Sequence, residues 1–144
     1  MLELVGARLG ERVVDLGGRV GSAAELAELL RRNQMPQVTP AAYVLPLGLQ
    51  GGKAGAGAGE YRQDVTEVVG VVLAVRVAGD ATGSKAVDIV TPIRDSAIRA
   101  IVGWGPDEAI GVFRVSRGEL LSMTNGMLLY QIDFALDDQL RIFE

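Results

Sequence analysis

Apolar residues recur at spacings of three and four in two N-terminal segments. In residues 2–16 this spacing predicts an amphipathic helix that ends at the Gly17-Gly18 pair; its stripe is Leu2, Val5, Leu9, Val13 and Leu16. A shorter helix is predicted after Ser22, because Glu25 completes a capping box three residues later and two arginines favour its C-terminal end. The N-terminal region therefore supplies two helices, each with one apolar face.

Two strands are predicted next. Residues 41–49 have a strand composition, but Pro46 cannot donate to a ladder, so we expect an edge position or a bulge there. Residues 61–77 predict a longer strand, and its middle, 68–75, is apolar on both faces apart from Gly70. Such a run needs cover on both sides. We expect helices to cover one face and a partner subunit or a lone helix to cover the other. Val72 and Leu73 point to opposite faces, so one of them is expected in the core and the other is a candidate interface residue, with the assignment left open.

The C-terminal half predicts one helix and a hairpin. Asp80, Thr82 and Ser84 are possible N-caps of a helix that extends to about Val102, which Pro92 should kink or split. The strands are expected at about 110–123 and 127–136, joined by Asn125-Gly126, a strong hairpin signal. In the second strand one alternating set should face the core: Leu128, Tyr130, Ile132, Phe134 and Leu136.

These elements, in the order α-α-β-β-α-β-β, predict an α+β fold. We expect an antiparallel or mixed four-stranded sheet with helices packed mainly on one face. A chain of 144 residues is one domain in size, so residues 1–144 are expected to form a single domain.

Residues 51–60, GGKAGAGAGE, form a low-complexity segment without large apolar side chains. A phosphate-binding loop would end in Gly-Lys-Ser/Thr at a helix N-terminus, whereas Lys53 precedes alanine and the segment leads into a strand. We predict a flexible loop between strands that becomes ordered on assembly. Its candidate interface residues are Gly51, Gly52, Lys53, Gly55, Gly57, Gly59 and Glu60.

Composition excludes several kinds of chemistry. The chain has no histidine and no cysteine, which removes catalytic triads, Cys/His dyads and the usual zinc sites. Asp133, Asp137 and Asp138 are the remaining acidic candidates, but adjacent residues of a strand point to opposite faces, so a solvated strand end or interface is favoured over a metal or catalytic site. The net charge of −4 disfavours a nucleic-acid-binding module. We expect no cofactor and, without a signal-peptide or membrane-spanning pattern at the N-terminus, a soluble protein with no membrane partner.

The chain as a whole resembles the tail terminator, or tail completion, proteins of long-tailed bacteriophages. The resemblance rests on the N-terminal helix, MPQVTPAAYVLPLG, the glycine-rich segment, VTEVVGVVLAVRV, GWGP and the final GVFRVSRGELLSMTNGMLLYQIDFALDDQLRI. None of these is an active-site motif. The resemblance therefore implies regions of function, not individual catalytic residues.

The resemblance implies a structural virion protein and not an enzyme. Such a subunit forms a homo-hexameric ring at the head-proximal end of the tail, stops polymerisation of the tail tube protein and presents a surface to the head-tail connector. It would assemble in the cytoplasm of the bacterial host, and genomic DNA would pass its lumen without specific binding. Two alternatives stay open: a carboxylate- or magnesium-dependent enzyme using Asp133 and Asp137, and another head-tail joining or tube-like virion protein.

Overall fold

A computed structural model describes residues 1–124 and 126–143. Within them the chain forms three α-helices, a short 3-10 helix and a five-stranded sheet. In chain order the elements are α1 (Leu2–Arg12), η1 (Val14–Leu16), β1 (Val20–Ser22), α2 (Ala23–Arg31), β2 (Ala41–Gly57), β3 (Glu60–Arg76), α3 (Ser84–Ile101), β4 (Phe113–Thr124) and β5 (Met127–Phe143). The predicted α+β class is confirmed. The strand count of four is wrong, because the three-residue β1 is too short to show a period.

The strands are ordered β1-β2-β3-β5-β4 across the sheet. β1 is parallel to β2 and all other pairs are antiparallel, so the sheet is mixed. β3 and β5 pair along their whole lengths, from Glu60 opposite Phe143 to Arg76 opposite Met127. Thr124 of β4 lies opposite Met127 of β5, as expected of a hairpin, although the predicted turn residue Asn125 lies outside the described residues.

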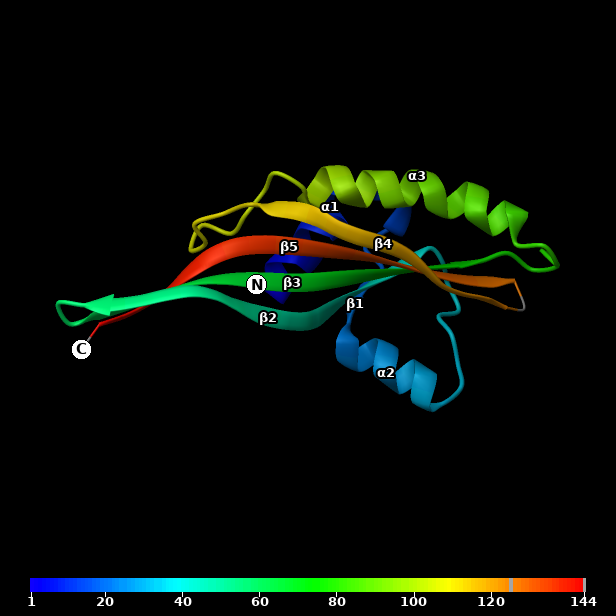
Figure 1. Cartoon of the computed structure of the whole chain (residues 1–144). Helices are drawn as coiled ribbons and strands as arrows, with labels where there is room; N and C mark the ends of the chain where they lie inside the picture. Colours follow the sequence, from blue (N-terminus) through cyan, green and yellow to red (C-terminus); the bar gives the residue numbers. More distant parts are fainter. Residues whose placement is uncertain (125, 144) are drawn as a thin grey trace.

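The main core lies between the sheet and two helices, α1 and α3, which cover the same face (Figure 1). Val71 and Leu73 of β3 are buried there with Ile132 and Phe134 of β5. The helices contribute a set of fully or nearly fully buried side chains: Val5, Leu9, Val90, Ile93, Ala97 and Ile101. The predicted core face of the last strand is confirmed, because four of its five residues are buried and Tyr130 packs against the same cluster.

A second, smaller core lies on the opposite face of the sheet, beneath α2 (Figure 1). Val72 and Ala74 of β3 are buried there against Leu26 of α2 and Tyr43 of β2. Since Val72 is 1% exposed and Leu73 is 0% exposed, both faces of this part of β3 are already covered by the chain itself. The expectation that a partner subunit covers one face here is therefore wrong, and the alternative of a lone helix is confirmed.

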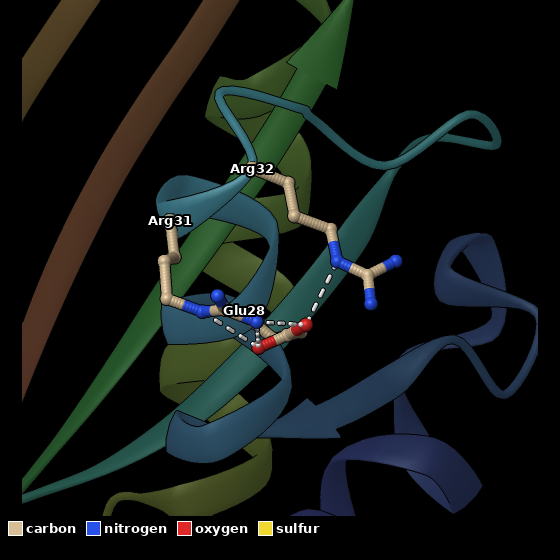
Figure 2. A network of polar contacts seen from close by, with 3 residues as sticks. All are labelled: Glu28, Arg31 and Arg32. Carbon is tan, nitrogen blue, oxygen red and sulfur yellow. Dashed lines mark hydrogen bonds and ion pairs between the residues drawn. The ribbon is translucent and has the colours of Figure 1, made fainter.

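The N-cap predicted for α2 at Ser22 is confirmed, and the Glu25 carboxylate accepts from the Ser22 hydroxyl at 3.5 Å. The Ser22 hydroxyl accepts a hydrogen bond from the Glu25 backbone N–H at 3.2 Å. At the other end of the helix, Glu28 forms ion pairs with Arg31 at 2.7 Å and Arg32 at 2.8 Å (Figure 2). All three side chains are largely exposed, so together these pairs add at most about 1 kcal/mol.

Helix α3 is capped from outside its first turn and continues through a proline. The buried Asp80 carboxylate accepts hydrogen bonds from the backbone N–H groups of Lys85, at 3.4 Å, and Ala86, at 2.9 Å. Pro92 lies within the single helix Ser84–Ile101, so of the two predicted alternatives, a kink or a split, the split is wrong. Pro92 is exposed while Val90 and Ile93 beside it are buried, and packing on the sheet offsets the missing backbone hydrogen bond.

The central strands extend beyond the helices as a three-stranded arm (Figure 1). We define the arm as residues 49–67 of β2, its turn and β3, together with residues 137–143 of β5. The prediction of a loop at 51–60 is wrong, because 51–57 belong to β2 and the turn is at Ala58-Gly59, where both φ angles are positive. Backbone pairing with β3 does not require side chains, so a Gly/Ala sequence can be held as a strand by its neighbour.

Candidate assembly surfaces

One face of the arm is apolar and uncovered. Tyr61 lies opposite Ile142, and Gln63 opposite Leu140, so these side chains share a face with Val65. Leu49 of β2 lies opposite Glu67 and joins the same face. Apart from the partly buried Val65, the apolar side chains are exposed, from 36% for Tyr61 to 63% for Leu49. We call Leu49, Tyr61, Val65, Leu140 and Ile142 the apolar face of the arm.

The opposite face of the arm is mostly polar. Glu60 and Arg62 form an ion pair at 2.6 Å, and this hydrogen bond lowers the pKa of Glu60. Further along, Arg141 donates to Gln139 at 2.7 Å. Phe143, 70% exposed, is an apolar residue on this face. The difference between the faces means that the arm itself is amphipathic.

A second uncovered apolar strip follows β4 at the far side of the sheet. Val115, Leu120 and Met123 lie opposite Phe134, Tyr130 and Leu128 of β5, and therefore on the face that carries α1 and α3. The three side chains are 41%, 47% and 41% exposed. Arg94 of α3 lies over the Tyr130 ring with its guanidinium carbon 5.7 Å from the ring centroid. We call Val115, Leu120 and Met123 the β4 strip.

The two outer strand edges are free but irregular. In the described residues, β1 pairs only with 42–44 of β2, and β4 pairs only with β5. The outer edge of the rest of β2 and the outer edge of β4 therefore have no strand beside them there. Register shifts interrupt β2 at Pro46/Gly48 and Gly51/Ala54, and β4 at Val115/Arg117 and Leu120/Ser122. The predicted irregularity at Pro46 is thus confirmed. Bulges, proline and charged residues on an edge oppose simple edge-to-edge pairing.

The acidic candidates do not converge. Asp137 accepts hydrogen bonds from the Thr66 hydroxyl and the Arg114 guanidinium, both at 2.8 Å, and these partners lower its pKa. Asp138 points to the other face and accepts from the Ile110 backbone N–H at 3.1 Å, as predicted for adjacent strand residues. Asp133 accepts from the Gln131 amide at 2.8 Å. Asp133 and Asp137 are four residues apart on one strand, roughly 13 Å. The pair needed by the enzyme alternative is therefore not assembled.

The other predicted interface residues separate into two groups. Five of them, Gly51, Gly52, Lys53, Gly55 and Gly57, lie on exposed β2 of the arm, while Gly59 is in the turn and Glu60 begins β3. No helix follows this segment, so the geometry of a phosphate-binding loop is not formed. Val72 and Leu73 are both inside the subunit, which corrects the expectation that one of them is available to a partner.

The apolar face of the arm was missed from the sequence. Leu136, Leu140 and Ile142 continue the alternation of β5, but the Asp137-Asp138 pair suggested that the strand ended there. Exposure of an apolar residue also cannot be inferred from its own strand alone. It depends on where the helices stop.

Within residues 1–124 and 126–143, no group of three or more acidic side chains is arranged to hold a metal ion. None of the helices in this part of the chain has the length and hydropathy to cross a membrane.

The amphipathic arm and the β4 strip are exposed apolar surfaces of the kind that proteins use to contact other protein chains. A comparison with family models matches residues 1–143 to the family described as phage tail terminator protein. The chain therefore belongs to the phage tail terminator family, which confirms the resemblance noted in its sequence and makes it a structural tail protein of a bacteriophage virion.

The other comparisons add little. A search of curated proteins found no match. Among solved structures, a chain of "Virion of native gene transfer agent (GTA) particle" is 15% identical at a TM-score of 0.42, with 88% of this chain and 84% of that chain covered. A likeness of this strength does not define the fold.

Proposed function

We propose that this protein forms a homo-hexameric ring at the head-proximal end of the tail, where it ends growth of the tail tube and offers a surface to the head-tail connector. The observation that carries the proposal is the family match over residues 1–143. A tail terminator has to contact copies of itself, the tube below and the connector above. It therefore needs several protein-binding surfaces and no reactive centre.

The structure supports this proposal through the distribution of its surfaces. The arm and the β4 strip lie at different places on one subunit, which suits heterologous contacts that close into a ring. The net charge of −4 suits a lumen that lets DNA pass without gripping it. A tube-like or other head-tail joining protein would use similar surfaces, so position in the particle separates the alternatives.

The test is growth of tail tubes from purified tail tube protein. Added to growing tubes, this protein should shorten their length distribution and appear as a single ring at one tube end in negative-stain images. Light scattering should give the mass of six chains for the ring. Tubes of unchanged length, with no density at either end, would contradict the proposed function. Density repeated along the tubes would favour the tube-like alternative.

A further inference from the structure

The apolar face of the arm has no cover within its own subunit. The arm extends past α1 and α3, which cover the continuation of the same face nearer the middle of the sheet (Figure 1). Leu136, the last residue of β5 before the arm, is completely buried, whereas Leu140 and Ile142 are 42% and 51% exposed. The core face therefore continues outward, past Glu67 and Asp138, as a surface with exposed apolar side chains after the helices end. Exposed apolar surface of this kind marks a protein contact.

The β4 strip is the complementary uncovered surface, but it lies too far away to meet the arm of its own subunit. Leu120 lies opposite Tyr130, and Leu140 follows Tyr130 by ten residues on β5. Ten residues of strand span roughly 34 Å. Val115, the member of the strip nearest the arm, lies opposite Phe134, six residues or roughly 20 Å before Leu140. Because both surfaces lie on the same face of one sheet, they can meet only between different copies of the chain.

Charge favours the same pairing. Among its paired β3 and β5 residues, the apolar face of the arm carries two acidic side chains, Glu67 and Asp138, and no basic one, whereas α3, which lies on the face of the β4 strip, has three basic and two acidic side chains. In the proposed contact, the arm, with its excess of acidic side chains, would lie against the region of α3 and the β4 strip, with its excess of basic side chains. This charge complementarity favours the contact and fixes its orientation. Edge-to-edge strand pairing is less suitable, since both free edges are interrupted by register shifts.

From these observations, and resting on the proposed function, we propose that the apolar face of the arm of one subunit packs on the β4 strip of the next copy. The contact is heterologous, because the two sides come from different parts of the chain. Repeated around an axis, it uses one arm and one β4 strip from every subunit and leaves neither surface free in a closed ring.

Paired charge substitutions test both sides of the contact. Leu140→Glu on the arm and Leu120→Glu on the β4 strip should each weaken self-association by at least about tenfold, because the contact would bury a carboxylate against apolar side chains. The matched controls are Gln139→Glu and Thr124→Glu, which add the same charge on the opposite face of the same strands. Sedimentation at several concentrations, with and without tail tube protein, measures the change, and circular dichroism verifies folding. If either glutamate variant misfolds, the alanine variant at the same position, Leu140→Ala or Leu120→Ala, is used in its place.

Cross-linking identifies which surfaces meet. The chain contains no cysteine, so Leu140→Cys and Leu120→Cys introduce unique reactive sites. A short bismaleimide should link a mixture of the two single variants into heterodimers, and it should link the double variant into a ladder of up to six chains. Each single variant alone should remain unlinked.

Three outcomes would overturn the proposal. Links within Leu140→Cys alone would mean that arms meet each other. Normal assembly of both glutamate variants, or rings without mixed links, would mean that the arm faces another protein such as the tube. Rings that stop tube growth without these links refute only the contact, whereas links without any effect on tube growth refute only the proposed function.

Discussion

Shortening Leu73 and Val72 separately to alanine tests whether both faces of β3 belong to the interior of the subunit. Leu73 is 0% exposed beneath α1 and α3, and Val72 is 1% exposed beneath α2. Removing three carbon atoms from Leu73 costs about 2.4 kcal/mol in transfer free energy, and the remaining cavity raises the expected loss to about 3–4 kcal/mol. Removing two carbon atoms from Val72 costs about 1.6 kcal/mol, or about 2–3 kcal/mol with its cavity.

Urea unfolding at low protein concentration measures these losses. Circular dichroism and the fluorescence of Trp104, the single tryptophan, report the transition. Trp104 is a suitable probe because it packs on Phe113, with ring centroids 5.9 Å apart, and lies beneath the Arg8 guanidinium. With an m-value of about 2 kcal/mol/M, a loss of 3 kcal/mol moves the midpoint by about 1.5 M. The exposed Val38→Ala serves as a control and should change stability by less than about 0.5 kcal/mol.

The result that would refute this reasoning is specific. If Val72→Ala left the free energy of unfolding of the isolated subunit unchanged but weakened self-association, the face beneath α2 would be covered by a partner and not by the chain itself. Leu73→Ala would still destabilise the subunit in that case. Comparison of the two variants in the isolated subunit therefore separates core from interface. The measurement is made at low protein concentration because an obligate oligomer would lose stability with either variant.

Three further predictions concern single features. Asp80→Ala should cost about 1–2 kcal/mol in a denaturant titration by removing the cap of α3, and Asp80→Asn should retain part of this. In an NMR titration the Asp137 carboxyl should ionise below the ordinary aspartate range, because Thr66 and Arg114 bind its charged form, and Thr66→Val should raise that pKa. Any stability it adds is present above its unfolded-state pKa and is lost as the pH falls through the folded-state value. A protein that lacks residues 51–60 should still unfold cooperatively in urea, because 51–59 are exposed. Loss of cooperative unfolding would show that the arm supports the core.

Much of the architecture could be predicted from local pattern. The stripe in 2–16 indicated α1, although the α-helix ends at Arg12 and a separate 3-10 helix covers 14–16. Ser22 and Glu25 indicated the start of α2, and the alternation in 128–136 indicated which face of β5 is buried. These features are encoded within a few residues, because capping and periodicity act over one or two turns or pleats. The absence of histidine and cysteine likewise excludes catalytic triads with histidine, Cys/His dyads and the usual zinc sites, whatever the fold.

The assembly surfaces depended on tertiary structure. The segment 51–57 lacks strand-forming side chains, yet β3 holds it in a ladder, and β5 continues past two aspartates because β3 remains beside it. Val72 was a candidate for an interface until the fold placed α2 over it, and Leu140 became one because no helix reaches it. Burial is a property of the whole chain. The sequence determined which residues are apolar, and only the packing of distant elements decided which of those residues remain uncovered.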